Sequence, residues 1–525
     1  MPKKKSIAAG ALILTAASII TRLLGFVYRI YLTNEVGAEG IGLYQLIMPI
    51  YSLAWSICCS GFSVVVSKIV AQENIKGESG NMGRALKTGL IITGIISAAV
   101  AGLIFFLSPV LAGNLYNDPR IELSFKILSF AIPFMSIGSC IRGYFLGLHE
   151  PSVPAVSQVL EQLVRMGAAF VLGGTFLKMG LEYACAACVI GILAGEVLSM
   201  LYVAYSYGAF KKRRKLTKHP TIGAKAMTAM IFSMAMPLTL NRISGSLLSA
   251  VENILIPTRL QAFGLTQAEA ISQFGRITGM AFPLIFFPSA LLMALATTLV
   301  PAVAEAVAVK NLARVNHMAS RVFFFSAVIG AGAAAIFAAI PYELGFAIYK
   351  QDISEMLFIL AFMCPLWYLN ITFSGILNGL GEQLLMFKNG IVSSVINILF
   401  IWFLVPAWGV HGFIAGWFVG VLYVLIRSVR RIKSRTSMDI DYLKWFAKPT
   451  LAAIATGLCA KQIARHIIFP AMQMPVGVAV IILITGSVYM FFILLLKCVT
   501  AEDLRTVFKG FLAKKEFTPK DKSTL

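Results

Sequence analysis

The chain has 525 residues, of which 58% are hydrophobic and only 13% charged, with a net charge of +22 at pH 7. A soluble protein keeps roughly a quarter of its residues charged, so this composition excludes an ordinary soluble domain. The Lys and Arg residues lie in short segments between apolar blocks, which is typical of membrane proteins and argues against nucleic acid as a partner.

The apolar blocks recur along the whole chain, most of them at or above the ~20 residues that a helix needs to cross ~30 Å of hydrocarbon. Backbone groups in lipid have to be paired within their own segment, so the blocks indicate helices and an all-α membrane protein of about 14 transmembrane helices. The predicted helices are 8–32, 41–69, 88–112, 123–147, 152–176, 183–207, 227–257, 273–305, 319–341, 353–379, 386–405, 409–428, 447–469 and 475–497. Prolines within them predict kinks, at Pro49, Pro133, Pro237, Pro283 and Pro288.

The basic residues orient these helices. If the N-terminus is inside, seven of the 45 Lys and Arg residues fall in outer loops or outer helix ends: Arg120, Lys126, Lys178, Arg259, Lys350, Lys461 and Arg465. Most of the others lie in inner loops and tails, including the basic runs at 211–215 and 427–435. This bias predicts that both termini are cytoplasmic, with the lipid bilayer as the first partner.

An internal repeat is visible in the glycine pattern. The residues Pro133, Gly143, Gly147, Leu148 and Glu150 recur as Pro365, Gly375, Gly379, Leu380 and Glu382, each displaced by 232 residues. The offset spans six helices, an even number, so it predicts two parallel halves, as in secondary transporters that bind substrate between lobes. Chance matching among glycine-rich helices is the alternative, and the ordered run favours a true repeat.

The domain boundaries follow from this repeat. We expect an N-terminal lobe with six helices, a basic linker, a C-terminal lobe with six helices, a second basic linker, two final helices and a basic tail. These parts span 1–210, 211–226, 227–430, 431–446, 447–498 and 499–525.

Ionisable side chains inside membrane helices are expensive, and each one is therefore a candidate functional residue. They are Arg22, Arg29, Glu161, Arg165, Glu196, Arg242, Glu252 and Arg276. The positive excess suits an anionic substrate, because guanidinium groups bind phosphate in a bidentate manner.

Arg22 and Arg29 are seven residues apart, on nearly the same face of one helix, and we expect Arg276 to face them from the other lobe. The alternative for Arg29 and Arg276 is that they extend to the outer headgroups. Arg165 lies at i+4 from Glu161, which favours a structural ion pair.

Arg242 and Glu252 on the seventh helix either line the cavity or neutralise each other. Neither a metal nor another cofactor is expected. The five histidines are scattered, the eight cysteines lie in or beside apolar blocks, and no nucleotide-binding P-loop is present.

Two motifs carry a resemblance to a known family. Thr21-Arg22-Leu23-Leu24-Gly25-Phe26 resembles the opening motif of bacterial lipid II flippases, and Arg276 with Phe282-Pro283 and Leu295-Ala-Thr-Thr-Leu-Val-Pro301 resembles their eighth helix. The whole-chain pattern looks most like the stage V sporulation protein B family of polysaccharide transporters, in the multidrug/oligosaccharidyl-lipid/polysaccharide superfamily.

This resemblance implies a two-lobed, non-enzymatic flippase of the bacterial cell membrane that carries an undecaprenyl-pyrophosphate-linked glycan outward by alternating access. It implies a place in cell-wall, spore-cortex or polysaccharide biosynthesis, with cell-wall synthesis enzymes as candidate partners. Arg22 and Arg276 match family arginines at the substrate cavity, whereas Arg29 lies one position away from another. The second helix departs from lipid II flippases, since Pro49-Ile-Tyr-Ser-Leu-Ala-Trp55 has no arginine.

Two other functions remain open. One is a multidrug or cation antiporter of the same superfamily, in which carboxylates rather than arginines would dominate the cavity. The other is a non-transporting membrane scaffold that recruits cell-wall enzymes.

Overall fold

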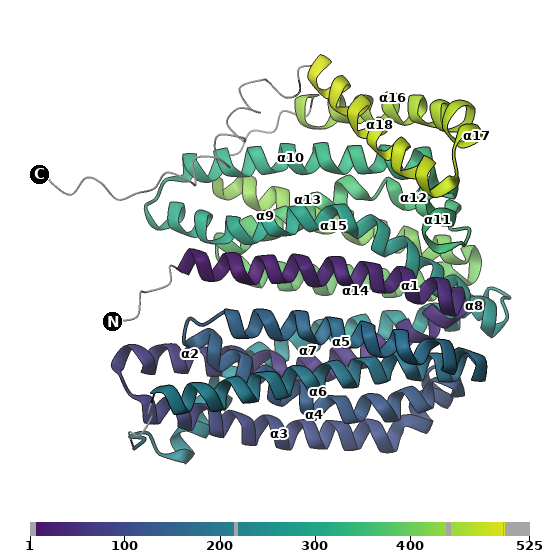
Figure 1. The fold of residues 1–525 in the computed structure, drawn as a ribbon. Helices are drawn as coiled ribbons and strands as arrows, with labels where there is room; N and C mark the ends of the chain where they lie inside the picture. Colours follow the sequence, from purple (N-terminus) through teal and green to yellow (C-terminus); the bar gives the residue numbers. More distant parts are fainter. Residues whose placement is uncertain (1–6, 215–218, 437–442, 497, 499–525) are drawn as a thin grey trace, which may run out of the picture. The chain divides into compact units, whose positions relative to one another are not determined.

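The computed structural model describes residues 7–214, 219–436, 443–496 and 498. Every regular element within these ranges is helical (Figure 1). The first six residues, parts of both predicted basic linkers and the predicted basic tail lie outside the described residues.

The α-helices keep the labels of Figure 1, and short π-helical or 3-10 segments are given by their residues. The helices are α1 Ile7–Trp55, α2 Gly61–Lys76, α3 Ser79–Val110, α4 Glu122–Gly147, α5 Ser152–Phe176, α6 Leu181–Arg214, α7 Ala224–Ala262, α8 Gln267–Gly275, α9 Phe282–Ala308, α10 Leu312–Ala339, α11 Pro341–Tyr349, α12 Ser354–Ala361, α13 Cys364–Gly379, α14 Gln383–Trp408, α15 Val410–Thr436, α16 Lys448–Ile463, α17 Phe469–Ala471 and α18 Met474–Leu495.

The described residues contain ten helical stretches that are long and apolar enough to cross a membrane, or eleven if the bent pair α12 and α13 counts as one span. The chain is therefore a multi-pass membrane protein, although this criterion stops short of the predicted fourteen spans. One stretch, Leu12–Lys76, has 65 residues and is broken inside α1 at Gly37, where φ is 70°. Neither α7 nor α16 is among the ten.

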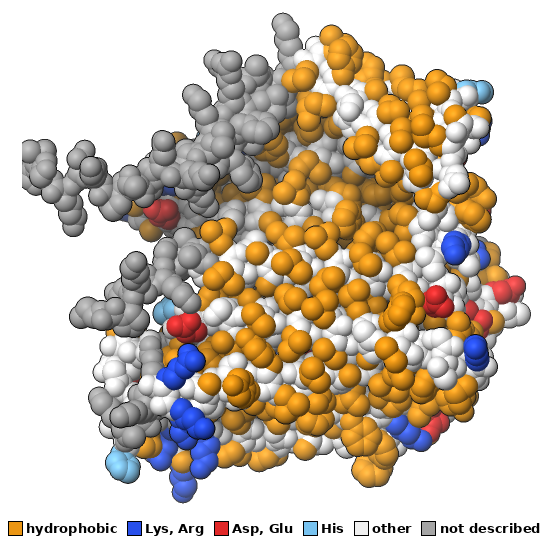
Figure 2. Space-filling view, in the orientation of Figure 1, with side chains coloured by type: hydrophobic (Ala, Val, Ile, Leu, Met, Phe, Trp, Pro, Cys, Tyr) orange, Lys and Arg blue, Asp and Glu red, His pale blue; other side chains and the backbone are white. Residues whose placement is uncertain are grey.

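Exposed side chains on these helices are largely apolar. On the face drawn in Figure 2, hydrophobic side chains cover the middle of the helices and charged side chains appear near the helix ends. Phe106 of α3 is 79% exposed, Val171 of α5 73% and Leu483 of α18 71%. Such surfaces are costly in water and suit a hydrocarbon environment.

Two compact units can be distinguished, and each is described by itself. One comprises the chain up to residue 290 together with 349–351 and 382–424, and the other comprises 291–348, 352–381 and 425 onward. The predicted domain boundaries follow the sequence repeat rather than this division, and they stay predictions.

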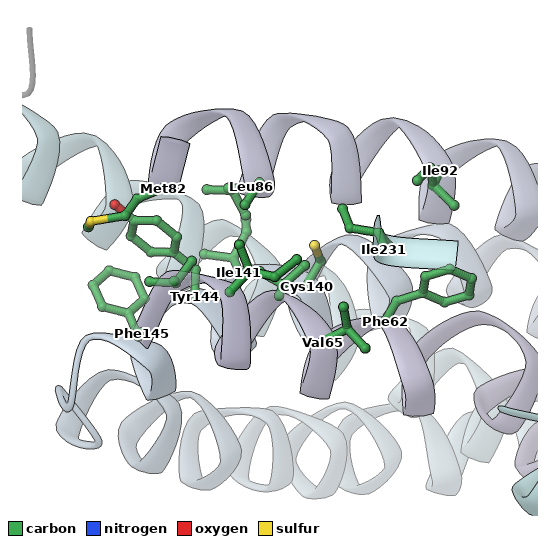
Figure 3. Close-up of a cluster of buried hydrophobic side chains, with 14 of the residues drawn as sticks. Phe62, Val65, Met82, Leu86, Ile92, Cys140, Ile141, Tyr144, Phe145 and Ile231 are labelled. Atoms are coloured by element: carbon green, nitrogen blue, oxygen red, sulfur yellow. The ribbon is translucent and has the colours of Figure 1, made fainter. Parts of the chain in front are cut away.

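In the first unit, a hydrophobic cluster lies between α2, α3, α4 and α7 (Figure 3). Phe62 of α2, Leu86 of α3 and Tyr144 of α4 pack there with Ile231 of α7. The side chain of Asn81 on α3 forms several hydrogen bonds beside the cluster. It donates to Glu73 and Thr221, and it accepts the backbone N–H groups of Thr221 and Ile222. The start of α7 is thereby fastened to α2 and α3.

In the second unit, α10 lies against α13, α16 and α18. Ala331 and Ala335 of α10 pack with Ala452 of α16 and Tyr489 of α18. The Tyr489 hydroxyl donates to the carbonyl of Val328 at 2.9 Å, so the last long helix is joined to α10 by both packing and a hydrogen bond.

The repeated glycines make equivalent contacts within each unit. Gly147 on α4 lies against Val70 of α2 and the carbonyl of Ser67, and Gly379 on α13 lies against Val303 of α9 and the carbonyl of Val300. Both pairs of contact partners are displaced by 233 residues, nearly the displacement of the glycines themselves. Such approaches require a residue without a Cβ, which explains why glycine recurs at these positions.

Candidate functional site

Arg22 and Arg29 line one pocket, which we call the arginine pocket. It has a volume of about 350 Å³ and is lined by Ile19, Arg22, Leu23, Gly25, Phe26, Arg29, Pro283, Phe286, Phe287 and Ala290. Arg22 is exposed and Arg29 is half-buried. The rest of the lining is apolar, and the rings of Phe26 and Phe287 are 4.6 Å apart. The predicted proximity of these two arginines is thus present in the structure.

A break in hydrogen-bond register positions Arg29. Residues Arg276–Ala281 form a π-helical segment, in which the N–H of Phe282 donates to Ile277 five residues back. The next N–H in this register would serve the carbonyl of Thr278, but it belongs to Pro283, which has none. That carbonyl instead accepts from Arg29 Nη1 at 3.5 Å and from Gln45 Nε2 at 3.4 Å.

Arg276 is the third arginine of the expected site. It begins the π-helical segment and is half-buried. Its Nε is buried without a hydrogen-bond partner among the described residues, and it lines neither the arginine pocket nor the larger cavity described below. The expectation that it faces Arg22 and Arg29 from the other lobe stays a prediction.

Arg242 and Glu252 do not neutralise each other. The exposed Arg242 places its guanidinium 5.6 Å from the ring centre of Trp55. Ten residues further along α7, Glu252 Oε2 accepts from Asn397 Nδ2 of α14 at 3.0 Å. Each group therefore has its own neighbour, and neither lines a cavity described here.

A larger polar cavity lies among α1, α2, α4, α5 and α6, and we call it the charged cavity. It has a volume of about 810 Å³ and is lined by Leu14, Ser18, Met48, Tyr51, Ser52, Trp55, Ser63, Ser139, Arg142, Leu146, Pro154, Gln158, Glu161, Arg165 and Glu196. Arg165 thus belongs to this cavity and not to the arginine pocket.

Hydrogen bonds hold most of the charged groups of this cavity. Arg165 Nη2 and Glu161 Oε1 are 2.7 Å apart, which confirms the predicted i,i+4 ion pair. Glu196 is buried, and its Oε1 accepts from the Tyr51 hydroxyl at 2.7 Å. Arg142 Nη1 donates to the Ser199 hydroxyl at 3.0 Å.

Sequence reasoning missed Arg142 and Tyr51 as cavity residues. Arg142 falls near the inner end of a predicted helix, where a basic residue is expected to orient the chain. The signal that was available is its neighbourhood, because Ser139 and Gly143 are small residues that permit close helix approach. Tyr51 follows Pro49 on the helix that departs from the lipid II flippase pattern.

The described thiols and carboxylates are scattered or packed among helices. No group of three or more His, Cys, Asp or Glu side chains suited to a metal ion occurs within the described part of the chain. Cys185 and Cys188, the pair with redox-like spacing, are buried, and Cys185 donates to the carbonyl of Gly40. Both thiols act here as small packing groups.

Comparisons with known proteins add the family context. Residues 7–307 match the family described as "Polysaccharide biosynthesis protein". The stage V sporulation protein B of Bacillus subtilis is 28% identical over 510 residues, covering 96% of this chain and 98% of that protein. The lipid II flippase MurJ of the same organism is 29% identical over 334 residues, or 59% of each chain.

Solved structures are similar in fold. A structure of the lipid II flippase MurJ in an inward closed conformation superposes with a TM-score of 0.66 at 14% identity, covering 96% of this chain and 100% of that one. An inward-facing multidrug resistance transporter of the MATE family, from the MOP superfamily, gives a TM-score of 0.63 at 14% identity, covering 82% and 100%.

Proposed function

We propose, from the premise that this chain belongs to the polysaccharide biosynthesis protein family, that it is a flippase for an anionic lipid-linked oligosaccharide or peptidoglycan precursor. The chain is a membrane transporter of this family rather than an enzyme. The proposal adds the substrate, its movement from the inner to the outer leaflet of the bacterial cell membrane, and an alternating-access mechanism.

The observation that carries the proposal is the arginine pocket. Two guanidinium groups of one helix line a small pocket whose other walls are apolar, including Phe26 and Phe286. A pyrophosphate loses most of its hydration in such a place, and charge-assisted hydrogen bonds from Arg22 and Arg29 would replace it. The apolar walls strengthen these bonds by lowering the local dielectric.

Fourteen crossings with both termini cytoplasmic complete the proposal. Four features supplement the ten spans. Because it is broken at Gly37, the 65-residue stretch crosses the membrane twice in this proposal. The bent pair α12 and α13 adds one further crossing. The 39-residue α7 is long enough to cross, as is α16 with its π-helical continuation Ala464–Ile468.

A cation antiporter is the main rival. The carboxylates Glu161 and Glu196 in the charged cavity favour it, together with the fold likeness to MATE transporters. The two arginines of the arginine pocket oppose it, since they would repel a cationic substrate. A non-transporting scaffold is the second rival, and it requires no movement of substrate at all.

Transport by the purified protein in proteoliposomes tests these functions directly. A fluorescent polyprenyl-pyrophosphate sugar serves as substrate, and an organic cation serves as the antiporter probe. We expect the lipid-linked sugar alone to move, and we expect the Arg22→Ala, Arg29→Ala double variant to lose at least tenfold in rate. The transport rate of Arg22→Lys should lie between those of the wild-type protein and the double variant, because lysine keeps the charge but lacks the planar guanidinium group.

Arg314→Ala is the matched control, since Arg314 is half exposed and lies outside the arginine pocket. Membrane abundance is measured for every variant, so that loss of protein is separated from loss of transport. Full transport by the double variant at normal abundance would overturn the role of the arginine pocket. Movement of the cation alone would support the antiporter, and movement of neither substrate would support the scaffold.

A further inference from the structure

We propose that the charged cavity binds the glycan head of the substrate and selects heads that carry no net charge, the pyrophosphate being held separately beside Arg22 and Arg29. This inference rests on the proposed flippase function and names its substrate class more narrowly. It follows from a difference between the two cavities in charge and in unsatisfied polar atoms.

The charged cavity is balanced, whereas the arginine pocket is cationic. Arg142 and Arg165 line the charged cavity together with Glu161 and Glu196. The lining of the arginine pocket contains two arginines and no carboxylate. Of these two cavities, the arginine pocket is the one that offers surplus positive charge to a polyanionic ligand. An acidic group placed in the charged cavity would lie near carboxylates as well as guanidinium groups.

Two polar atoms of the charged cavity are buried without a partner in the described structure. One is Oε2 of Glu196, a residue that is only 3% exposed, and the other is Nε of Arg165. Buried polar atoms are normally hydrogen-bonded, so a lone acceptor and a lone donor along one cavity indicate a ligand with both kinds of group. Sugar hydroxyls donate and accept, and an amide of an N-acetyl sugar also does both. A carboxylate on the sugar would be repelled by Glu196.

The charged cavity is also lined by two aromatic side chains, as is usual in sugar-binding sites. Tyr51 and Trp55 lie one turn apart on the second half of α1, and both line the cavity. Aromatic faces with a few fixed polar groups are the usual lining of small-ligand sites, and a volume near 810 Å³ falls within their range of ~300–1,000 Å³. This leaves room for a disaccharide and its bound water.

The two cavities are lined by residues on adjacent turns of α1. Ser18 lines the charged cavity, and Arg22 lines the arginine pocket. Four helical residues correspond to a rise of about 6 Å, which is close to the separation of a pyrophosphate from the first sugar attached to it. One substrate can therefore place its glycan at Ser18 and its phosphates at Arg22.

Two measurements on the full-length protein test the selection. The first is binding of free disaccharides to detergent-purified protein, followed by tryptophan fluorescence, with Trp55→Phe showing which part of the signal arises in this cavity. The probes are a neutral disaccharide of two N-acetylhexosamines and one of equal size that contains a uronic acid. We expect the neutral probe to bind at least tenfold more tightly.

The second measurement compares transport of polyprenyl-pyrophosphate substrates that carry the same two heads. In Glu196→Gln, the preference for the neutral head over the acidic head should fall several-fold in both binding and transport. The amide no longer repels a carboxylate, and it still accepts a hydrogen bond from the Tyr51 hydroxyl. Glu305→Gln is the control, because the Glu305 side chain is 70% exposed and lies outside the cavity. It should leave the preference unchanged.

Equal binding of both probes by the wild-type protein would overturn the inference, as would a preference for the acidic probe or an unchanged preference in Glu196→Gln. Selective binding of the neutral probe without any transport would uphold this inference and count against the flippase. Transport of both lipid-linked heads at equal rates, with equal binding, would uphold the flippase and reject only the selection.

Discussion

Gly42 and Gly275 lie against each other where the second half of α1 crosses α8. A Cβ on Gly42 would overlap the carbonyl oxygen of Ile271, and a Cβ on Gly275 would overlap that of Ala38. The two glycines are 233 residues apart, and so are the two carbonyls. The two glycine–carbonyl contacts are thus equivalent under the displacement of the predicted repeat.

This reciprocity is the property of a two-fold contact, in which one surface patch meets its own equivalent. Here the two patches belong to one chain, and such a crossing is what a pseudo-two-fold relation between the halves of the predicted repeat would produce. The same displacement relates the contacts of Gly147 and Gly379, which lie in different units. These equally displaced contacts support the predicted internal repeat, which stays a prediction.

Alanine at Gly42 or Gly275 should destabilise the protein by about 1–3 kcal/mol, because the added methyl group forces two backbones apart. Thermal unfolding in detergent measures this effect as a lower midpoint for each variant. Gly94→Ala is the control, since no atom lies within 4 Å of a Cβ at Gly94. There alanine should be neutral or slightly stabilising, by up to ~1 kcal/mol. Equal midpoints for Gly42→Ala and Gly94→Ala would contradict the close crossing.

Replacement of Pro283 by alanine restores a backbone N–H two residues beyond the π-helical segment. That N–H would then compete for the carbonyl of Thr278, which now accepts from Arg29 and Gln45. We expect transport to fall several-fold through a raised KM, with thermal stability unchanged or improved. Pro288→Ala, which restores an N–H further along α9, serves as the control and should retain a normal KM. A normal KM in Pro283→Ala would show that the freed carbonyl is unimportant.

Loss of the Asn81 side chain should release the start of α7 from α2 and α3. Asn81→Ala leaves the buried Glu73 carboxylate and two backbone N–H groups without this partner, which costs about 1–3 kcal/mol. Asn81→Asp should be at least as harmful near pH 7, since it sets a second carboxylate against Glu73. Thermal unfolding midpoints show which of the two variants is less stable, and an Asn81→Asp protein as stable as wild type would refute this account.

The topology is tested by single cysteines and a membrane-impermeant maleimide in intact cells. Cys459 is the exposed native thiol among the described residues, and Cys459→Ser provides the background. Cysteines at Asn117 and Leu265 should react from outside, whereas those at Glu78 and Lys310 should react only after the cells are opened. Labelling at Lys310 in intact cells would disprove the fourteen-helix orientation.

Much of the architecture is a local property of the sequence. Membrane insertion depends on the apolar content of each segment, and orientation depends on nearby Lys and Arg, so composition alone predicted a helical membrane protein. The i,i+4 pair of Glu161 and Arg165 was also predictable, because both residues lie on one helix. The repeat was predicted from glycines, and close backbone contacts leave little choice of residue at Gly143 or Gly375.

The tertiary structure alone decided which charged groups on different helices share a cavity. Arg22 and Arg29 converge because a single helix carries both, whereas Glu196 meets Tyr51 only when α6 packs beside α1. The placement of Arg276 also depends on helix geometry that the sequence pattern does not show. It begins a π-helical segment, and an extra residue in a turn rotates the side chains around it relative to an α-helical register. Hydrophobicity places a helix in the membrane, but its rotation about its own axis is set by side chains on other helices, which no local pattern contains.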